Sequence, residues 1–353
     1  ITLSQMPTVS APPESKCPPG ITSENNKLRV ADIAAHDWYR FVLSFPPHLV
    51  RDYLQRFEVT PRHTVLDPFC GTGTTLVECK KFGIPSIGIE RNPVAQFATQ
   101  VKLDWAVDPD GLLDHARDVA RRTSKQLEAE GFDDTHGLPL FENGKKVSSS
   151  LKTLPADAYR LILRDSISPL PLHKTLVLLE QLGRQRDDRY DRHERLALAK
   201  AIVFGISNLH FGPEVGIGEQ KVDAPVVSVW LRGIQRMVDD LRALGSKRRP
   251  RSAVHLADSR ELSRVVEPES VDVVITSPPY PNEKDYTRTT RLESVLLGFI
   301  TSKADLRAIK KDLVRSNTRS VYQQDTDDLL VQGHPEINRI AEAIEQRRIE
   351  LGK

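Results

Sequence analysis

The chain has 353 residues, of which 39% are hydrophobic and 28% charged, and its formal net charge is only +2. This composition is ordinary for a soluble globular protein with a sizeable core and excludes a membrane protein, since no apolar run could span a bilayer and no secretory leader is recognisable. We therefore expect a cytoplasmic protein without a membrane partner, in which local basic clusters must carry any binding to nucleic acid.

The N-terminal part predicts a tail and then a helix. Residues 1–28 are rich in Pro, Ser and Lys, and we interpret them as a flexible tail. An aromatic-rich segment follows over residues 36–57, where Pro46 and Pro47 suit the first turn of an amphipathic helix. The chain has three cysteines without paired metal-ligand spacing, so we expect free thiols, no disulfide framework and no metal site.

A strand-turn-helix-strand pattern comes next. We expect a strand over residues 63–66, a glycine-rich turn, a helix over residues 74–82 and a second strand over residues 86–89. This pattern is half of a doubly wound parallel sheet. Residues 29–105 therefore predict the first part of an α/β domain.

The pattern from residue 106 to residue 250 is mostly helical and predicts an insertion into that domain. Short apolar runs at residues 253–257 and 271–275 are typical of strands buried on both faces, so residues 251–353 continue the sheet. Helices are expected near residues 291–300, 304–314 and 336–351, but no further strand is recognisable. A four-stranded parallel sheet with an open edge is unusual, so we expect this chain to lack its C-terminal strands.

The turn after the first strand, Asp67–Thr75, reads DPFCGTGTT. Glycines just past a buried strand let the backbone approach a ligand, and a nucleoside-type ligand can lie over the carboxyl ends of parallel strands. Glu90 ends the second strand, 23 residues after Asp67, where a carboxylate can accept hydrogen bonds from both ribose hydroxyls. No Gly-Lys-Ser/Thr sequence follows, which argues against a nucleoside triphosphate. A glycine-rich turn without a ligand is the alternative interpretation.

The fourth strand ends in Thr276–Tyr280, which reads TSPPY. The two prolines remove two amide donors, so the turn offers the carbonyls of Ser277 and Pro278 as acceptors, while Tyr280 can stack on a base flipped out of its helix. Hydrogen-bond acceptors at both N–H groups of an aromatic amine would aim its lone pair at an electrophilic methyl group. Such positioning alone can lower the activation free energy by up to roughly 7 to 11 kcal/mol. No covalent intermediate is needed, and none of the cysteines follows a proline, as ring-carbon methylation would require. A proline turn that merely ends a strand is the alternative.

Other polar residues near the expected strand ends allow two interpretations. Asp258 and Ser259 can bind the adenine amino group of a cofactor, or Asp258 can cap the helix that begins near Arg260. The basic cluster at residues 246–251 can pair with phosphates or form a solvated linker. Five residues after the TSPPY turn are expected to lie near a flipped strand: Asn282, Lys284, Tyr286, Arg288 and Arg291.

With these residues in place, the chain resembles the amino-methyltransferases of DNA modification systems. Asp67–Thr75 resembles their cofactor-binding motif I, and Thr276–Tyr280 resembles their catalytic motif IV in the Ser-Pro-Pro-Tyr form, which is usually associated with N4 of cytosine. Residues 41–47 are similar to motif X, Glu90 to motif II and Asp258 to motif III.

The resemblance implies a Rossmann-like, S-adenosylmethionine-dependent methyltransferase fold, double-stranded DNA as the substrate and a restriction or defence-system partner. It implies that residues 106–250 contain the target-recognition region. It implies that the catalytic residues are Ser277, Pro278, Pro279 and Tyr280. It also implies that the cofactor-binding residues are Phe45, Pro46, Asp67, Phe69, Cys70, Gly71, Gly73, Thr74, Thr75, Glu90, Arg91, Asn92, Asp258 and Ser259.

Three other functions remain open. The chain can be an N6-adenine DNA methyltransferase, or an RNA guanine amino-methyltransferase, although those enzymes usually have Asp where Ser277 stands. It can also be a non-catalytic subunit that binds the cofactor or DNA, because the family's later motifs are not recognisable after Tyr280.

Overall fold

The computed structural model describes residues 28–41, 44–134, 151–211, 215–245, 250–280, 285–314 and 326–352. Nearly all of the predicted tail, most of the basic cluster at residues 246–251, and both Asn282 and Lys284 lie outside these ranges.

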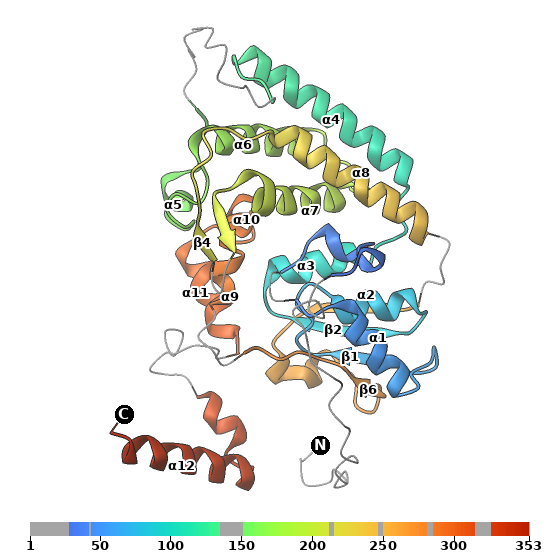
Figure 1. Cartoon of the computed structure of the whole chain (residues 1–353), viewed down its shortest axis with the longest axis vertical. Helices are drawn as coiled ribbons and strands as arrows, with labels where there is room; N and C mark the ends of the chain where they lie inside the picture. Colours follow the sequence, from blue (N-terminus) through green and yellow to red (C-terminus); the bar gives the residue numbers. More distant parts are fainter. Residues whose placement is uncertain are drawn as a thin grey trace.

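Four parallel strands form the central sheet (Figure 1), namely β1 (Val65–Asp67), β2 (Ser86–Glu90), β5 (Ser252–Leu256) and β6 (Val273–Val274). Their order is β5-β2-β1-β6, and Val65 of β1 lies opposite Ser86 of β2 and Val273 of β6. β1 has a neighbouring strand on each side and is buried over its whole length. All four predicted strands are confirmed, and their parallel order brings the four carboxyl ends to one edge.

Three helices cover this sheet, namely α1 (Pro47–Arg56), α2 (Thr74–Lys81) and α3 (Pro93–Lys102). Pro47 occupies the first turn of α1, as predicted, because a helix does not use the amide that proline lacks. Asn92 caps α3 by accepting a hydrogen bond from the amide of Val94. α1 packs against α2, and Val50 and Leu54 of α1 join Val65 and Ile275 in one buried cluster.

The insertion consists mainly of helices, as predicted, and they are α4 (Pro109–Ala129), α5 (Ala156–Tyr159), α6 (Pro169–Arg184), α7 (Asp191–Ala201) and α8 (Val226–Leu244). α4 packs against α6 and α8, and α7 packs against α8 (Figure 1). Trp230 of α8 is fully buried, and its indole N–H donates to the carbonyl of Glu194. A short hairpin of β3 (Leu209–Phe211) and β4 (Val215–Ile217) interrupts this mostly helical region. None of the described helices is both long and apolar enough to cross a membrane.

The segment before α1 connects the sheet domain to the insertion. The indole N–H of Trp38 donates to Asp240 of α8 at 2.7 Å. Tyr39 donates to the buried carboxylate of Glu293, and the imidazole of His36 forms a buried hydrogen bond with the carboxylate of Glu78 of α2 at 2.7 Å. These contacts anchor the N-terminal segment to three different elements.

After β6 the chain forms α9 (Tyr286–Thr289), α10 (Arg291–Leu296), α11 (Lys303–Asp312) and α12 (Pro335–Glu350). The three predicted C-terminal helices are confirmed, but α10 ends before residue 300 and is followed by Gly298 in the left-handed conformation at φ +83°. α10 is buried throughout, whereas α12 has no buried residue and lies apart (Figure 1). Within the described ranges, no strand follows β6.

Candidate active site

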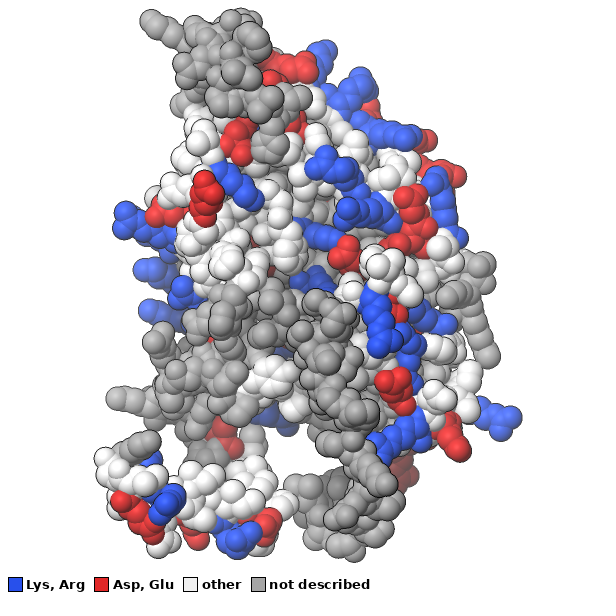
Figure 2. Space-filling model, in the orientation of Figure 1, with Lys and Arg blue, Asp and Glu red and all other residues white. Residues whose placement is uncertain are grey.

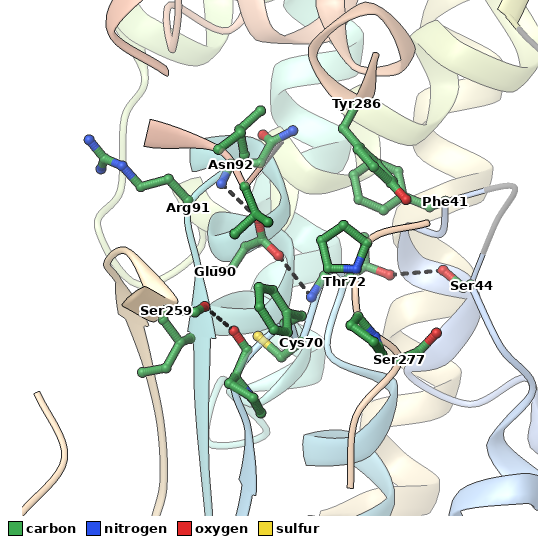
Figure 3. Close-up of a pocket in the computed structure, with 18 of the residues that line it drawn as sticks. Phe41, Ser44, Cys70, Thr72, Glu90, Arg91, Asn92, Ser259, Ser277 and Tyr286 are labelled. Carbon is green, nitrogen blue, oxygen red and sulfur yellow. Dashed lines mark hydrogen bonds between the residues drawn. The ribbon is translucent and has the colours of Figure 1, made fainter. Parts of the chain in front are cut away.

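A cavity opens at the carboxyl edge of the sheet. The turn after β1, the end of β2, the short helix η6 (Ser259–Arg264) and the turn after β6 all line it. Figure 3 shows Glu90, Cys70, Thr72 and Ser277 around this space. Residues that are more than 200 positions apart in the chain thus share one site.

Most of the predicted site residues line this cavity, and these are Phe45, Phe69, Cys70, Gly71, Thr74, Glu90, Arg91, Asn92, Asp258, Ser259, Ser277, Pro278, Pro279 and Tyr280. Four predicted cofactor-binding residues do not line it, namely Pro46, Asp67, Gly73 and Thr75. Pro46 instead lines an adjoining cavity that Ser277 and Tyr280 also border.

Asp67 connects two of the turns that form the site. It is fully buried, and its carboxylate accepts hydrogen bonds from the hydroxyls of Thr75 at 2.7 Å and Thr276 at 2.8 Å, and from the amide of Phe69 at 3.1 Å. Burial raises the pKa of Asp67 to about 6, and these three bonds oppose that shift. Asp67 and Thr75 do not line the cavity. They join the turn after β1 to the turn after β6.

The glycine turn is held from behind by α3. Gly71 has φ +53°, and a Cβ there would project into open space, with Phe41 the nearest group at 4.0 Å. Gly73 has φ +83°, and a Cβ there would lie 2.7 Å from the methyl group of Thr99. Thr99 donates to the carbonyl of Gly71 at 2.9 Å. Gly73 therefore serves close packing behind the loop, whereas Gly71 leaves room in the cavity.

Lys102 adds a second support to this turn. Its ammonium group is buried and donates to the carbonyl of Thr72 at 2.8 Å. Burial, together with the nearby cations of Arg40 and Lys200, lowers the pKa of Lys102 to about 7. No sequence pattern distinguishes this lysine, because only its tertiary position behind the turn gives it this role.

Glu90 is the acidic group that lines the cavity from the end of β2. Its two carboxylate oxygens accept hydrogen bonds from the amides of Gly71 at 2.9 Å and Asn92 at 2.7 Å (Figure 3). Burial raises the pKa of Glu90 to about 7, although these two bonds favour the charged form. Each oxygen retains a free lone pair, so the carboxylate can still accept hydrogen bonds from a ligand.

Asp258 caps a helix in this structure. Its carboxylate accepts from the amide of Arg260 at 2.9 Å and pairs with the guanidinium of the same residue. Burial opposes ionisation, but Arg260 holds the pKa of Asp258 below its usual value. Arg260 also pairs with Asp327 and donates to the carbonyl of Asp312 at 3.2 Å. The capping interpretation therefore describes Asp258, which nevertheless borders the cavity.

The turn after β6 presents acceptors to the cavity. Ser277 and the two prolines line it, and Tyr280 is 42% exposed beside them. The amide of Tyr280 donates to the hydroxyl of Tyr286 at 3.2 Å, so the first amide after the prolines is already bound. Tyr286, one of the residues expected near a flipped strand, itself lines the cavity.

The end of α11 also lines the cavity, through Asp312, Leu313 and Val314. An ion pair between Arg91 and Asp312 connects it to the end of β2. No motif marks these residues, because only tertiary packing brings them to the site.

Arg291 was predicted to lie near a flipped strand, and this prediction is wrong. Its side chain is buried and donates to the carbonyls of Thr287 at 3.1 Å and Leu161 at 3.3 Å. It therefore joins α10 to the insertion, whereas Arg288 is exposed.

Both cysteines in the described part of the chain, Cys70 and Cys79, are buried free thiols. Burial raises the pKa of Cys79 to about 12 and that of Cys70 well above its usual value, so neither is a thiolate at neutral pH. Across the described ranges, no three His, Cys, Asp or Glu side chains are grouped so that they could hold a metal ion.

The chain is similar to known proteins along about three quarters of its length. Residues 20–99 match a family model described as DNA methylase. The type II methyltransferase M.BsoBI of Geobacillus stearothermophilus is 29% identical over 290 residues, which are 74% of this chain and 52% of that protein. M.AvaI of a Nostoc species is 24% identical over 306 residues, which are 78% of this chain and 56% of that protein.

A shorter match of 69 residues, 42% identical, relates 19% of this chain to 13% of the type II methyltransferase M.MjaII of Methanocaldococcus jannaschii. No solved structure matches the chain. The chain spans about half the length of the first two relatives. Residues 20–99 are thus similar to DNA methylases, and about three quarters of the chain is similar to part of type II methyltransferases.

Proposed function

We propose that this chain carries the methyl-transfer site of a site-specific DNA methyltransferase, which moves a methyl group from S-adenosylmethionine to N4 of a cytosine flipped out of duplex DNA. The observation that carries this proposal is the shared cavity, in which Glu90 and Gly71 border the same space as Ser277 and Tyr280. The names of the relatives, type II methyltransferases, support it.

The cavity fits S-adenosylmethionine on three features of its lining. Gly71 leaves space where any side chain would intrude, Glu90 offers a buried carboxylate for the ribose hydroxyls, and Phe41 and Phe69 add apolar surface. When bound, S-adenosylmethionine supplies an electrophilic methyl group on its sulfonium. We assign Phe45 to the methionine end and Asn92 with Asp258 to the adenine end.

The turn after β6 would activate the target amine. The Ser277 hydroxyl and the Pro278 carbonyl accept hydrogen bonds from the two N–H groups, which directs the nitrogen lone pair out of the ring plane and toward the methyl group. Tyr280 stacks on the extruded base. Tyr286 binds the amide of Tyr280, so this amide does not compete with the amine for its acceptors.

Residues 106–250 are proposed to read the target sequence, and a restriction or defence-system protein is proposed as a partner. The helices of this insertion pack on the same core as α3, which would hold a recognition surface rigidly beside the cavity.

The base assignment rests on the serine of the TSPPY turn, and mapping the product tests it. The full-length protein would be incubated with duplex DNA or RNA and S-adenosylmethionine labelled in its methyl group, and the digested nucleosides would be separated. We expect label in N4-methylcytosine. Label in N6-methyladenine would overturn the base assignment, and label confined to RNA would overturn the DNA substrate. Cofactor binding without any transfer would identify a non-catalytic subunit.

The pKa of Glu90, raised by burial to about 7, predicts pH-dependent nucleoside binding. The ionised carboxylate accepts from ribose hydroxyls better than the protonated form, so affinity should rise as the pH increases through 7, by at most about tenfold per pH unit. Adenosine is a suitable probe because, unlike S-adenosylmethionine, it has no α-amino group that titrates in this range. Calorimetry from about pH 6 to about pH 8 would measure the effect.

The matched control is Glu90→Gln, which cannot ionise. It should bind adenosine more weakly and with little dependence on pH. If the parent and the Glu90→Gln protein showed the same pH profile, another group would be responsible and the role of Glu90 would be rejected.

A further inference from the structure

α11 has a row of basic side chains on its outer face. Lys303, Arg307 and Lys311 are spaced by four residues, which places them on one face of the helix, and all three are exposed. At a rise of 1.5 Å per residue, the row is about 12 Å long. Figure 2 shows Lys and Arg side chains along the edge of the molecule over α5 and α11.

These charges are available to a partner, unlike those of the arginines of α4 and α12. Every arginine of α4 and α12 forms an ion pair with an acidic residue three or four positions away. Within the described ranges, the side chains of Lys303, Arg307 and Lys311 have neither an ion pair nor a hydrogen bond. An exposed cation that is not neutralised by its own protein attracts an anionic ligand more strongly.

The C-terminal end of α11, beside this row of basic side chains, borders the candidate active site. The last residue of α11, Asp312, lines the cavity together with the two residues that follow it. α9 packs against α11, and an ion pair of 2.8 Å between Lys310 and Asp285 joins the two elements. Arg288 of α9 is exposed, and its side chain likewise forms no ion pair or hydrogen bond with a described residue.

We propose that Lys303, Arg307 and Lys311, with Arg288, form a contact surface for the DNA backbone beside the flipped base. This inference rests on the proposed function and adds the place where the duplex is held. With one phosphate per 3.4 Å of helix axis on each strand, a row of about 12 Å faces three to four nucleotides of one strand. Contacts of this kind set the position of the protein on DNA and do not read its sequence.

The test is a triple variant, Lys303→Gln, Arg307→Gln and Lys311→Gln, in the full-length protein. Equilibrium binding to duplex DNA would be measured over a salt series, with the DNA KM, kcat and cofactor affinity. Each phosphate contact contributes about 0.9 to the slope of log K against log salt, so three lost contacts should reduce the slope by about 3. Binding should weaken equally on methylatable and unrelated duplexes, while kcat and cofactor affinity stay unchanged.

The matched control removes the same charge from α12, through Arg339→Gln, Arg347→Gln and Arg348→Gln, and should retain the parental slope. An unchanged slope in the α11 variant would overturn the inference, as would an equal reduction in the α12 variant. If the parent protein transferred no methyl group to DNA and bound no DNA, the proposed function itself would fail. The two failures are therefore distinguishable.

Discussion

Replacing Ser277 with alanine is expected to reduce kcat for methyl transfer by about 10²- to 10³-fold, the usual effect of removing one positioned polar group from an active site. The serine hydroxyl is proposed to accept one of the two N–H groups of the target amine, and its loss leaves the nitrogen lone pair poorly aimed. Cofactor affinity should be nearly unchanged, because Glu90, Gly71 and Asn92 are untouched. Single-turnover transfer of a labelled methyl group, with cofactor binding measured separately, would check both expectations.

A serine outside the site provides the matched control for this experiment. Ser270 is exposed, and its hydroxyl donates to the carbonyl of Glu267 in the loop before β6, so Ser270→Ala should transfer methyl groups at the parental rate.

Tyr280→Ala should raise the KM for DNA, because stacking of a base on an aromatic side chain contributes about 1 to 3 kcal/mol to the free energy of binding. Activity that survives Ser277→Ala and Tyr280→Ala together would refute the catalytic role of the turn.

Local signals explain why the sheet could be predicted from the sequence. The strands are short apolar runs, and the first is followed by residues with a marked backbone preference, Pro68 and Gly71. The parallel order follows because helical segments separate the strands. Local pattern alone therefore assigns the turns at Gly71 and Ser277 to one edge of the sheet.

The errors arose where a role depends on tertiary partners. Arg291 follows the TSPPY turn closely in sequence, but its guanidinium is buried against Leu161 of the insertion. Val314 lines the cavity although no pattern in the sequence distinguishes it. Burial and pairing of this kind are not encoded in local periodicity.

Gly73→Ala is expected to destabilise the fold by about 2 to 5 kcal/mol and to weaken cofactor binding, through two separable effects. The left-handed backbone at φ +83° disfavours any Cβ, which costs about 1 to 2 kcal/mol. The new Cβ would also lie 2.7 Å from the methyl group of Thr99, which is fully buried and cannot move aside. Overpacking of this kind costs about 1 to 3 kcal/mol more and displaces the loop that lines the cavity.

Gly131→Ala is the matched control, because Gly131 has φ +89° but no atom within 4 Å of its Cβ position. It should show the backbone cost alone, about 1 to 2 kcal/mol in urea unfolding. Thr99→Ala combined with Gly73→Ala should be less destabilised than the sum of the two single changes, because the alanine at position 99 removes the clash. Equal losses for Gly73→Ala and Gly131→Ala would show that the backbone conformation, rather than close packing against α3, requires a glycine at position 73.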